Sequence, residues 1–381
     1  MELLGIDFGT SRLRIATANN DTVGVSPHKY SSARLPFVIQ SAAPFRITAL
    51  KRILDFDSAL PMPPSGISSM ALLADIFRDV LGECCPTGLS DRYTVVAVPP
   101  CISQRQRSAL RIVMTDLGLT RVRLVDDTLA ALLATWELVR TYKTILVYSW
   151  GAGMFTAGMY RMKANSYHLV SQEGDRELGG DDFDAVLVDV IVAQLKKLGR
   201  DGAPNNADDL IHIVNVAERL KRLSPLENTM TVPLNRLLPG TSNGVADVTI
   251  STENLSAAIQ RSTESTIALA LKAIGDASES KPEAILAVGG MTCSPMVQEA
   301  LRRHFGIPVI QASEHSVAIG TVLFGQLLPQ SEWGTQRQAA GSQRNADLTA
   351  QTAAAPDSAA QTTVQAESRN GQEKWSDNFV P

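Results

Sequence analysis

Gly5-Ile6-Asp7-Phe8-Gly9-Thr10-Ser11 is the stretch that decides the fold, and it is repeated imperfectly as Val147-Tyr148-Ser149-Trp150-Gly151-Ala152-Gly153-Met154-Phe155. In each copy an apolar run leads into a tight glycine turn and then into a second apolar run. Such a turn lets backbone N–H groups approach an anion closely, which is the form of a hairpin that binds phosphate. The first copy carries an acid and two hydroxyls, whereas Ser149 and Met154 replace the acid and the first hydroxyl in the second. The pair predicts a chain that holds a nucleotide but is poorly equipped to hydrolyse it.

The residues around the two hairpins follow one plan. Apolar, β-branched runs predict three strands in each copy, at 2–8, 12–18 and 22–26 and again at 144–150, 154–161 and 166–172. Helices and further strands then alternate in the order helix, strand, helix, with variable insertions. The sequence therefore predicts an α/β fold, an internal duplication with two mixed sheets and flanking helices that meet at a cleft. The two glycine turns are expected to face each other across it.

Local signals place the helices and strands that follow the hairpins. Ser103 and Gln106 form a capping box after the buried strand 93–98, and Gly118 ends that helix. Asp127 is expected to cap the next helix. In the second copy, Gly289-Gly290 makes a turn, and Ser294-Pro295 opens a helix with a cap and a first-turn proline.

Composition excludes several classes of function. The 381 residues carry a formal net charge of -4 and no block of Lys and Arg, so we expect no nucleic-acid partner. The most apolar helical candidate, 183–195, contains Asp184 and Asp189, so we expect no membrane span. The four cysteines include no CxxC pair, which argues against a zinc site. A secretory signal would begin with basic residues, whereas this chain has the acid Glu2 near its start, so the cysteines are expected to lie in the reducing cytoplasm.

The last part of the chain has a different composition. After Leu328 it is rich in Gln, Ala, Ser and Thr, with too little apolar surface to offset the entropy of ordering, so 330–381 is expected to be disordered. Trp333 and the final segment 374–381, which is aromatic and mildly acidic, are the exceptions. This terminus is interpreted either as an inert end or as a short peptide that docks on a partner.

Six segments, in order along the chain, resemble the nucleotide-binding domain of the seventy-kilodalton heat-shock chaperone family (Hsp70, DnaK type), a branch of the actin-like ATPase superfamily. The first hairpin is one of them, and "GDRELGGDDFD" at 174–184 is similar to the family's "GDTHLGGEDFD". The others are 98–119, 123–131, the helix 217–222 and "LAVGGMTCSP" at 286–295. The resemblance covers residues 3 to 328. It implies an actin-like ATPase fold of duplicated ribonuclease-H-like sheets, with ATP or ADP and Mg²⁺ as cofactors.

The resemblance also implies roles at the phosphate end of the cleft. It implies that Asp7 organises the water shell of Mg²⁺ and that Gly9, Thr10 and Ser11 hold phosphate oxygens. Lys51 matches the lysine that positions the attacking water, and Asp127 stands near the metal. From the residues alone, Lys51 could equally be a solvated surface charge and Asp127 a plain helix cap.

Further residues are implied to bind the nucleotide elsewhere in the cleft. Glu218, Lys221 and Arg222 share one helical face, where an ordinary surface ion pair is the alternative. The resemblance places these three around adenine and ribose. The glycines implied to contact the nucleotide are Gly151, Gly153, Gly179, Gly180, Gly289 and Gly290.

The departures from the family pattern bear on activity. The second phosphate loop has lost both acids and its threonine, and losing one acid that orients water lowers a rate by about 10²- to 10⁴-fold. Ala152 adds a Cβ where the family has glycine, which is costly if that residue needs a left-handed conformation. Cys293 replaces an arginine that stacks on adenine. The tip at 51–93 is short, and no peptide-binding domain is expected after Leu328.

We therefore expect lobe I at 1–142, lobe II at 143–329 and a tail at 330–381. The expected function is that of a monomeric, cytoplasmic ATP-binding protein of the chaperone type in the stress response, with weak or absent hydrolysis. Its partners would be chaperones or cochaperones of the J-domain or nucleotide-exchange type. A slow ATPase, a pseudo-ATPase scaffold, an actin-like assembly protein and a small-molecule kinase stay open as alternatives, although the chaperone-like segments weigh against the last two.

Overall fold

The structure is a computed structural model that describes residues 2–19, 22–35, 37–39, 46–51, 68–86, 88–89, 92–200, 203–204, 206–223, 229–239, 247–277, 281–329 and 333. The chain divides into two units, Met1–Gln336 and Arg337–Pro381, and the first contains all described residues. Residues 52–67, 87 and 90–91 of the short tip, and the tail with its docking peptide, Trp333 excepted, lie outside the described residues.

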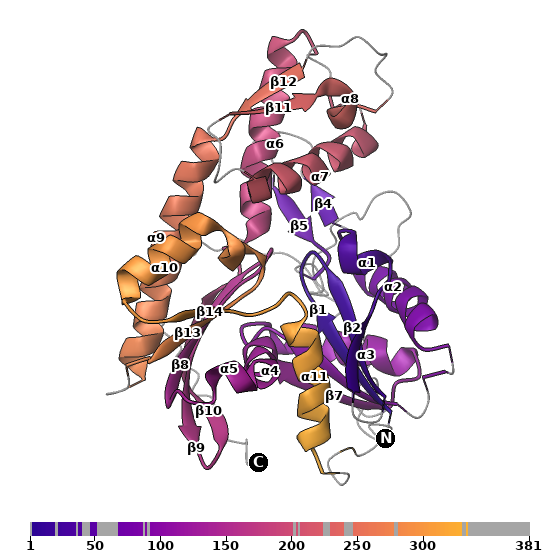
Figure 1. Cartoon of the computed structure of the whole chain (residues 1–381). Helices are drawn as coiled ribbons and strands as arrows, with labels where there is room; N and C mark the ends of the chain where they lie inside the picture. Colours follow the sequence, from indigo (N-terminus) through magenta and orange to yellow (C-terminus); the bar gives the residue numbers. More distant parts are fainter. Residues whose placement is uncertain are drawn as a thin grey trace, which may run out of the picture. The chain divides into compact units, whose positions relative to one another are not determined.

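Two five-stranded mixed sheets with the same topology form the centre of the first unit (Figure 1). The first has the order β3-β2-β1-β6-β7 and the second β10-β9-β8-β13-β14. In each, the first three strands are antiparallel and the last two run parallel to the central one. The bounds of the first sheet are β1 (Leu3–Phe8), β2 (Leu13–Asn19), β3 (Thr22–Ser26), β6 (Tyr93–Val98) and β7 (Arg121–Asp126). Those of the second are β8 (Thr144–Trp150), β9 (Phe155–Lys163), β10 (Ser166–Asp175), β13 (Ala284–Val288) and β14 (Val309–Gln311).

The duplicated α/β fold predicted from the sequence is confirmed by these sheets. The longer helices are α2 (Ser69–Cys84), α3 (Gln104–Asp116), α4 (Asp127–Ala134), α6 (Gly180–Lys197), α7 (Ala207–Leu223), α9 (Glu253–Asp276), α10 (Pro295–Phe305) and α11 (Ser316–Leu327). The short elements are α1 (Lys29–Ser32), β4 (Phe37–Ile39), β5 (Ile47–Ala49), α5 (Trp136–Val139), β11 (Thr229–Pro233), α8 (Leu234–Leu237), β12 (Asp247–Ser251) and the 3₁₀ turn η2 (Gly290–Cys293). The sequence had not predicted α2, α9 or the two small hairpins β4-β5 and β11-β12.

Alternation along the central strands decides which side chains face the other lobe. In β1, Leu4, Ile6 and Phe8 belong to the core under α2 and α3, so Leu3, Gly5 and Asp7 point to the opposite face. That face is covered by α11, which lies so close that a Cβ on Gly5 would be 2.2 Å from the Thr321 hydroxyl. Asp7 therefore ends the strand on the side of the cleft.

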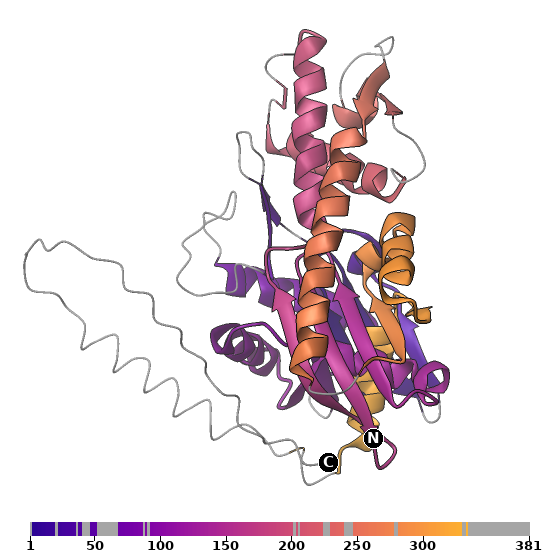
Figure 2. The same ribbon diagram turned by 90° about the vertical axis from the view of Figure 1, so that its left-hand side faces the viewer.

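The second sheet repeats this arrangement. Tyr148 and Trp150 are fully buried in the largest core, whereas Val147 belongs to the cluster packed against α4. Ser149 shares the face of Val147 and so also points toward the other sheet. The long helix α9 crosses β9 and β10 on the Tyr148 side and packs beside α6 (Figure 2).

Helices α4 and α11 pack together between the two sheets (Figure 1). A Cβ on Gly320 of α11 would lie 1.8 Å from the Ala130 carbonyl oxygen, so only glycine permits this approach. Although the predicted boundary assigns α11 to lobe II, its side chains Ala318 and Val322 pack on the first sheet. The lobe boundaries stay a prediction. Over the part of the chain that the structure describes, no helix is both long and apolar enough to cross a bilayer.

Three local predictions need correction or gain detail. The capping box of Ser103 and Gln106 is present, but α4 begins at Asp127 with Asp126 at the cap position, so Asp127 is not the cap. The helix predicted at Ser294-Pro295 is confirmed as α10, which begins at Pro295 with Ser294 at the N-cap, although the Ser294 side chain makes no capping hydrogen bond, and Gly289-Gly290 leads into η2. Ala152 is not among the described non-glycine residues with positive φ, so the expected strain does not arise.

Candidate functional site

A cavity of about 570 Å³ lies between the two hairpins, within the size range of small-molecule sites. Its walls include residues of both glycine turns, of α7 and of η2. At its floor the two turns touch: a Cβ on Gly153 would lie 2.5 Å from Thr10 Cγ2. The prediction that the two turns face each other across a cleft is thus confirmed, and Gly153 is required by this contact.

The predicted residues of the phosphate end meet in one buried group. Asp7, Lys51 and Asp127 all line the cavity, and Lys51 is only 7% exposed. The Lys51 ammonium donates to the Phe8 carbonyl oxygen, which excludes the interpretation of Lys51 as a solvated surface charge. Burial raises the pKa of Asp127 to about 7, against the opposing attraction of Lys51. The Asp127 Oδ1 atom is buried and has no hydrogen-bond partner among the described residues, so it is available to a ligand in the cleft.

The second hairpin uses its carbonyl groups to hold the start of α6. Gly180 N donates to Gly151 O at 3.1 Å, and Asp181 N donates to Ala152 O at 2.7 Å. Gly179 has no room for a side chain, because its Cβ would lie 2.2 Å from Ala152 O. Gly179 therefore positions the loop and is not among the residues that line the cavity. Gly151 and Gly180 do line it.

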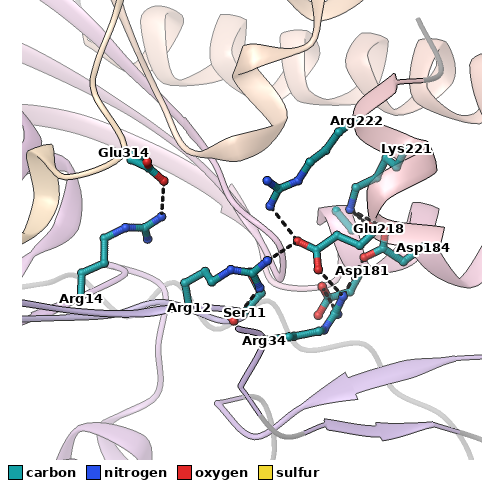
Figure 3. A network of polar contacts seen from close by, with 11 residues as sticks. Ser11, Arg12, Arg14, Arg34, Asp181, Asp184, Glu218, Lys221, Arg222 and Glu314 are labelled. Carbon is teal, nitrogen blue, oxygen red and sulfur yellow. Dashed lines mark hydrogen bonds and ion pairs between the residues drawn. The ribbon is translucent and has the colours of Figure 1, made fainter. Parts of the chain in front are cut away.

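The predicted adenosine residues are part of a charged network that links the two lobes (Figure 3). Glu218 is buried and accepts hydrogen bonds from Arg12 of the first hairpin and from Arg222, both at 2.8 Å. Lys221 Nζ lies 2.6 Å from Asp184 Oδ1 and donates to Gly180 O at 2.8 Å. Glu218 forms the i,i+4 ion pair with the exposed Arg222, but it is itself only 8% exposed and is also paired with Arg12 across the cleft, so the contact is more than an ordinary surface ion pair.

Arg34 completes the network from the first lobe. Its guanidinium donates to Asp181 at 2.6 Å and Asp184 at 2.9 Å, and it lies 3.7 Å from Glu218. Asp181 and Asp184 have fully buried side chains, and that of Arg34 is 4% exposed. Burial alone would raise the pKa of Glu218, but the surrounding cations, Arg12 and Arg34 foremost, hold it below its ordinary value.

Sequence reasoning missed Arg12, Arg14 and Arg34. Arg14 could have been found from the sequence, because the register of the predicted hairpin places it directly opposite Asp7. The matching pair in the second hairpin is Ser149 and Thr156. Arg34 carries no comparable signal in the sequence: it lies about 150 residues from its partners on α6.

The glycines of η2 have different roles. Gly289 has φ +94°, and a Cβ there would lie 2.4 Å from the Trp150 carbonyl oxygen, so the backbone itself demands glycine. Gly290 is exposed, lines the cavity, and a Cβ on it would meet no atom within 4 Å. Cys293 also lines the cavity. The cleft thus has the shape and the donor groups of a nucleotide site, with open space at Gly290.

Duplicated sheets around such a cleft define the class of two-lobed ATPases with the actin-like fold. The family model of the Hsp70 protein matches residues 65–334, and the chain belongs to the Hsp70 family. Hsp70 ATPase domains bind ATP or ADP with Mg²⁺, so the chain contains a chaperone-type ATP-binding domain. The first hairpin and Lys51 lie outside the matched residues; the structure brings them into the cleft.

Proposed function

We propose that this chain binds ATP or ADP in the cleft and hydrolyses ATP slowly or not at all. The observation that supports this most directly is the pair Ser149 and Thr156, which face each other at the mouth of the second hairpin and line the cavity. Both are hydroxyls where the family pattern has acids. Without a carboxylate, the second hairpin has no group that can deprotonate an attacking water.

In this proposal the nucleotide lies with its phosphates at the two turns. Gly9, Thr10 and Ser11 of the first turn and Gly151 and Gly153 of the second would surround the phosphates. Lys51 and Asp127 would face the terminal phosphate, and the position of Asp7 beside them is the one that the family uses toward Mg²⁺. The nucleoside would be held by Glu218, Lys221, Arg222, Gly179 through its support of the loop, Gly180, Gly289 and Gly290.

Glu218 is the residue whose pairing must change most when a nucleoside binds. Its carboxylate is already engaged by Arg12 and Arg222 at 2.8 Å each. A ribose hydroxyl can be accommodated only if it shares the carboxylate or displaces Arg12. Both hydrogen bonds go to Glu218 Oε1, so Oε2 is the oxygen that a ribose hydroxyl could share without displacing Arg12.

Two experiments test the proposal. Calorimetric titration of ATP and ADP should show binding, and phosphate release by the same preparation should stay near the uncatalysed background. Robust release that is abolished by Asp7→Ala would show instead a working ATPase. Absence of binding by either nucleotide would overturn the proposal as a whole.

A chain that binds nucleotide without turning it over would act through partners. We propose chaperone or cochaperone partners of the J-domain or nucleotide-exchange type, with a monomeric protein in the cytoplasm and a role in the stress response. The alternative is a pseudo-ATPase scaffold or an actin-like assembly protein. Sedimentation with and without nucleotide separates these, because only an assembly protein would form large species. A tail at 330–381 that docks on a partner is part of the same proposal.

A further inference from the structure

The ends of the two hairpins place four equivalent side chains on the wall of the cleft. Strand register pairs Asp7 with Arg14 in the first hairpin and Ser149 with Thr156 in the second. The four positions carry one negative charge, one positive charge and two neutral hydroxyls. All four line the cavity. The phosphate end is therefore not the acidic site that a divalent cation requires.

Arg14 is held in place as a fixed cation. Its Nη1 lies 3.7 Å from Asp7 Oδ2, and its Nη2 donates to Glu314 Oε2 at 3.0 Å (Figure 3). The side chain is 15% exposed, and its Nε is buried without a hydrogen-bond partner among the described residues. Glu314 is itself 70% exposed. The guanidinium therefore lies at the wall of the cleft with donor capacity left for a ligand.

The residues present do not fit a magnesium ion. Mg²⁺ requires a near-octahedral set of oxygen ligands, usually one or two carboxylates together with waters and substrate phosphates. The two carboxylates here, Asp7 and Asp127, each have a cation as their electrostatic partner, Arg14 and Lys51 respectively. A divalent ion beside Asp7 would lie within a few ångströms of the Arg14 guanidinium and be repelled by it.

We propose that this cleft binds nucleoside di- or triphosphate without a divalent cation, and that the Arg14 guanidinium supplies the fixed positive charge in its place. A planar guanidinium matches two phosphate oxygens at once and remains charged at all physiological pH values. The hydroxyls of Ser149 and Thr156 can donate to phosphate where carboxylates would repel it. The inference rests on the proposed nucleotide binding and concerns how the phosphate charge is balanced.

The first test compares nucleotide affinity with and without metal. A fluorescent ADP analogue is titrated into the full chain in EDTA and again in excess Mg²⁺. Equal affinities within about threefold are expected. A loss of affinity of more than tenfold in EDTA would overturn the inference and leave the proposed function intact. Failure to bind under either condition would overturn the proposed function instead.

Two substitutions should then act in opposite directions. Removing the charge-assisted contact in Arg14→Ala should weaken binding in EDTA roughly 10- to 100-fold, as expected for loss of a hydrogen-bonded charge. Asp7→Asn removes the carboxylate that competes for Arg14, so binding should stay equal or tighten. At a metal-dependent site Asp7→Asn should weaken binding in Mg²⁺ by more than tenfold, and that result contradicts the inference.

Controls separate the charge effect from loss of fold. Arg14→Lys keeps the charge and should retain metal-independent binding with reduced affinity, whereas a metal requirement in this variant would count against the inference. Arg78→Ala removes an arginine that is 63% exposed on α2 and should change nothing. Thermal unfolding of each variant checks that the titrated protein is folded. If Arg14→Ala does not fold, Arg14→Lys and Asp7→Asn still decide the question.

Discussion

Arg34 Nη2 lies 2.6 Å from Asp181 Oδ1, and this pair joins the first lobe to the start of α6 in the second. Neither side chain is exposed by more than 4%. A second carboxylate, Asp184, binds the same guanidinium and also Lys221. The lobes are thus joined by fully desolvated charges, whose removal one at a time leaves an uncompensated charge in the interior.

Arg34→Ala is expected to lower the free energy of unfolding by about 3–5 kcal/mol, because Asp181 and Asp184 would remain buried with less positive charge. Denaturation by urea, followed by circular dichroism, measures this. The matched control is Arg78→Ala, which removes an exposed pair with Asp75 and should cost no more than about 1 kcal/mol. A similar small effect in both variants would show that the Arg34 pairs do not hold the lobes together.

Glu218→Gln should destabilise the protein in a pH-dependent way. The cations around Glu218 hold its pKa below the ordinary 4.5, so its contribution is present above that pH and is lost as the pH falls through the lower folded value. The wild type should therefore exceed the variant in unfolding free energy at pH 7, and the difference should shrink below about pH 4.5. Urea titrations at pH 7 and pH 4 test this. A difference that grows on acidification would contradict the assigned pairing.

The two glycines of η2 should respond differently to substitution. Gly289→Ala places a Cβ 2.4 Å from a carbonyl oxygen at positive φ and should lower the free energy of unfolding by more than about 2 kcal/mol. Gly290→Val enters open space beside the cavity, so its melting temperature should stay near that of the wild type. Its nucleotide affinity, measured by calorimetry, should fall at least roughly tenfold, because the side chain occupies space that the ligand needs. Unchanged affinity in a folded Gly290→Val protein would move the nucleotide away from η2.

Restoring an acid to the second hairpin should raise hydrolysis. Ser149→Asp returns a carboxylate to the cavity wall opposite Thr156, where it can orient water. ATP turnover should rise roughly 100-fold or more, the low end of the effect of one positioned acid or base. Ser166→Asp on exposed β10 is the control for an added negative charge. If Ser149→Asp stays as inactive as the wild type, the missing acids are not the reason for slow hydrolysis.

Trp333 packs on the first sheet, in the hydrophobic cluster that also contains Ala318 and Val322 of α11. It is 3% exposed and packs edge-on against Tyr93 with ring centroids 4.9 Å apart, while the Arg123 guanidinium lies 5.9 Å from its ring. Trp333→Ala should lower the free energy of unfolding by about 3–5 kcal/mol through the cavity it leaves. Leu327→Ala, at a side chain that is 70% exposed, should stay within about 0.5 kcal/mol of the wild type. Equal effects in thermal unfolding would mean that Trp333 contributes no packing.

The sequence by itself determined the duplicated sheets, because strand alternation and glycine turns are local signals. Runs such as 93–98 and 144–150 coincide with β6 and β8. The cleft could be predicted from the duplication, because two copies of the same unit place their glycine turns opposite each other. The helix α9 was missed although a local signal was present, because its buried residues Leu255, Ile259, Thr263 and Ile267 recur every four residues.

Only the tertiary structure decided which charges meet in the cleft. The residues next to Lys51 in the sequence suggest an exposed lysine. In the folded protein Lys51 is buried beside Phe8 and Asp127. Arg34 meets Asp181 and Asp184 from a distant part of the chain, a contact that no local pattern encodes. Asp7 and Arg14 depend on both local and tertiary structure. The register of the first hairpin makes them neighbours. Arg14 becomes part of the cleft wall only because Glu314 and the second hairpin pack around the pair. Secondary-structure propensity depends on residues that are close in the sequence. The charge of a site is set instead by side chains that folding brings together from distant parts of the chain.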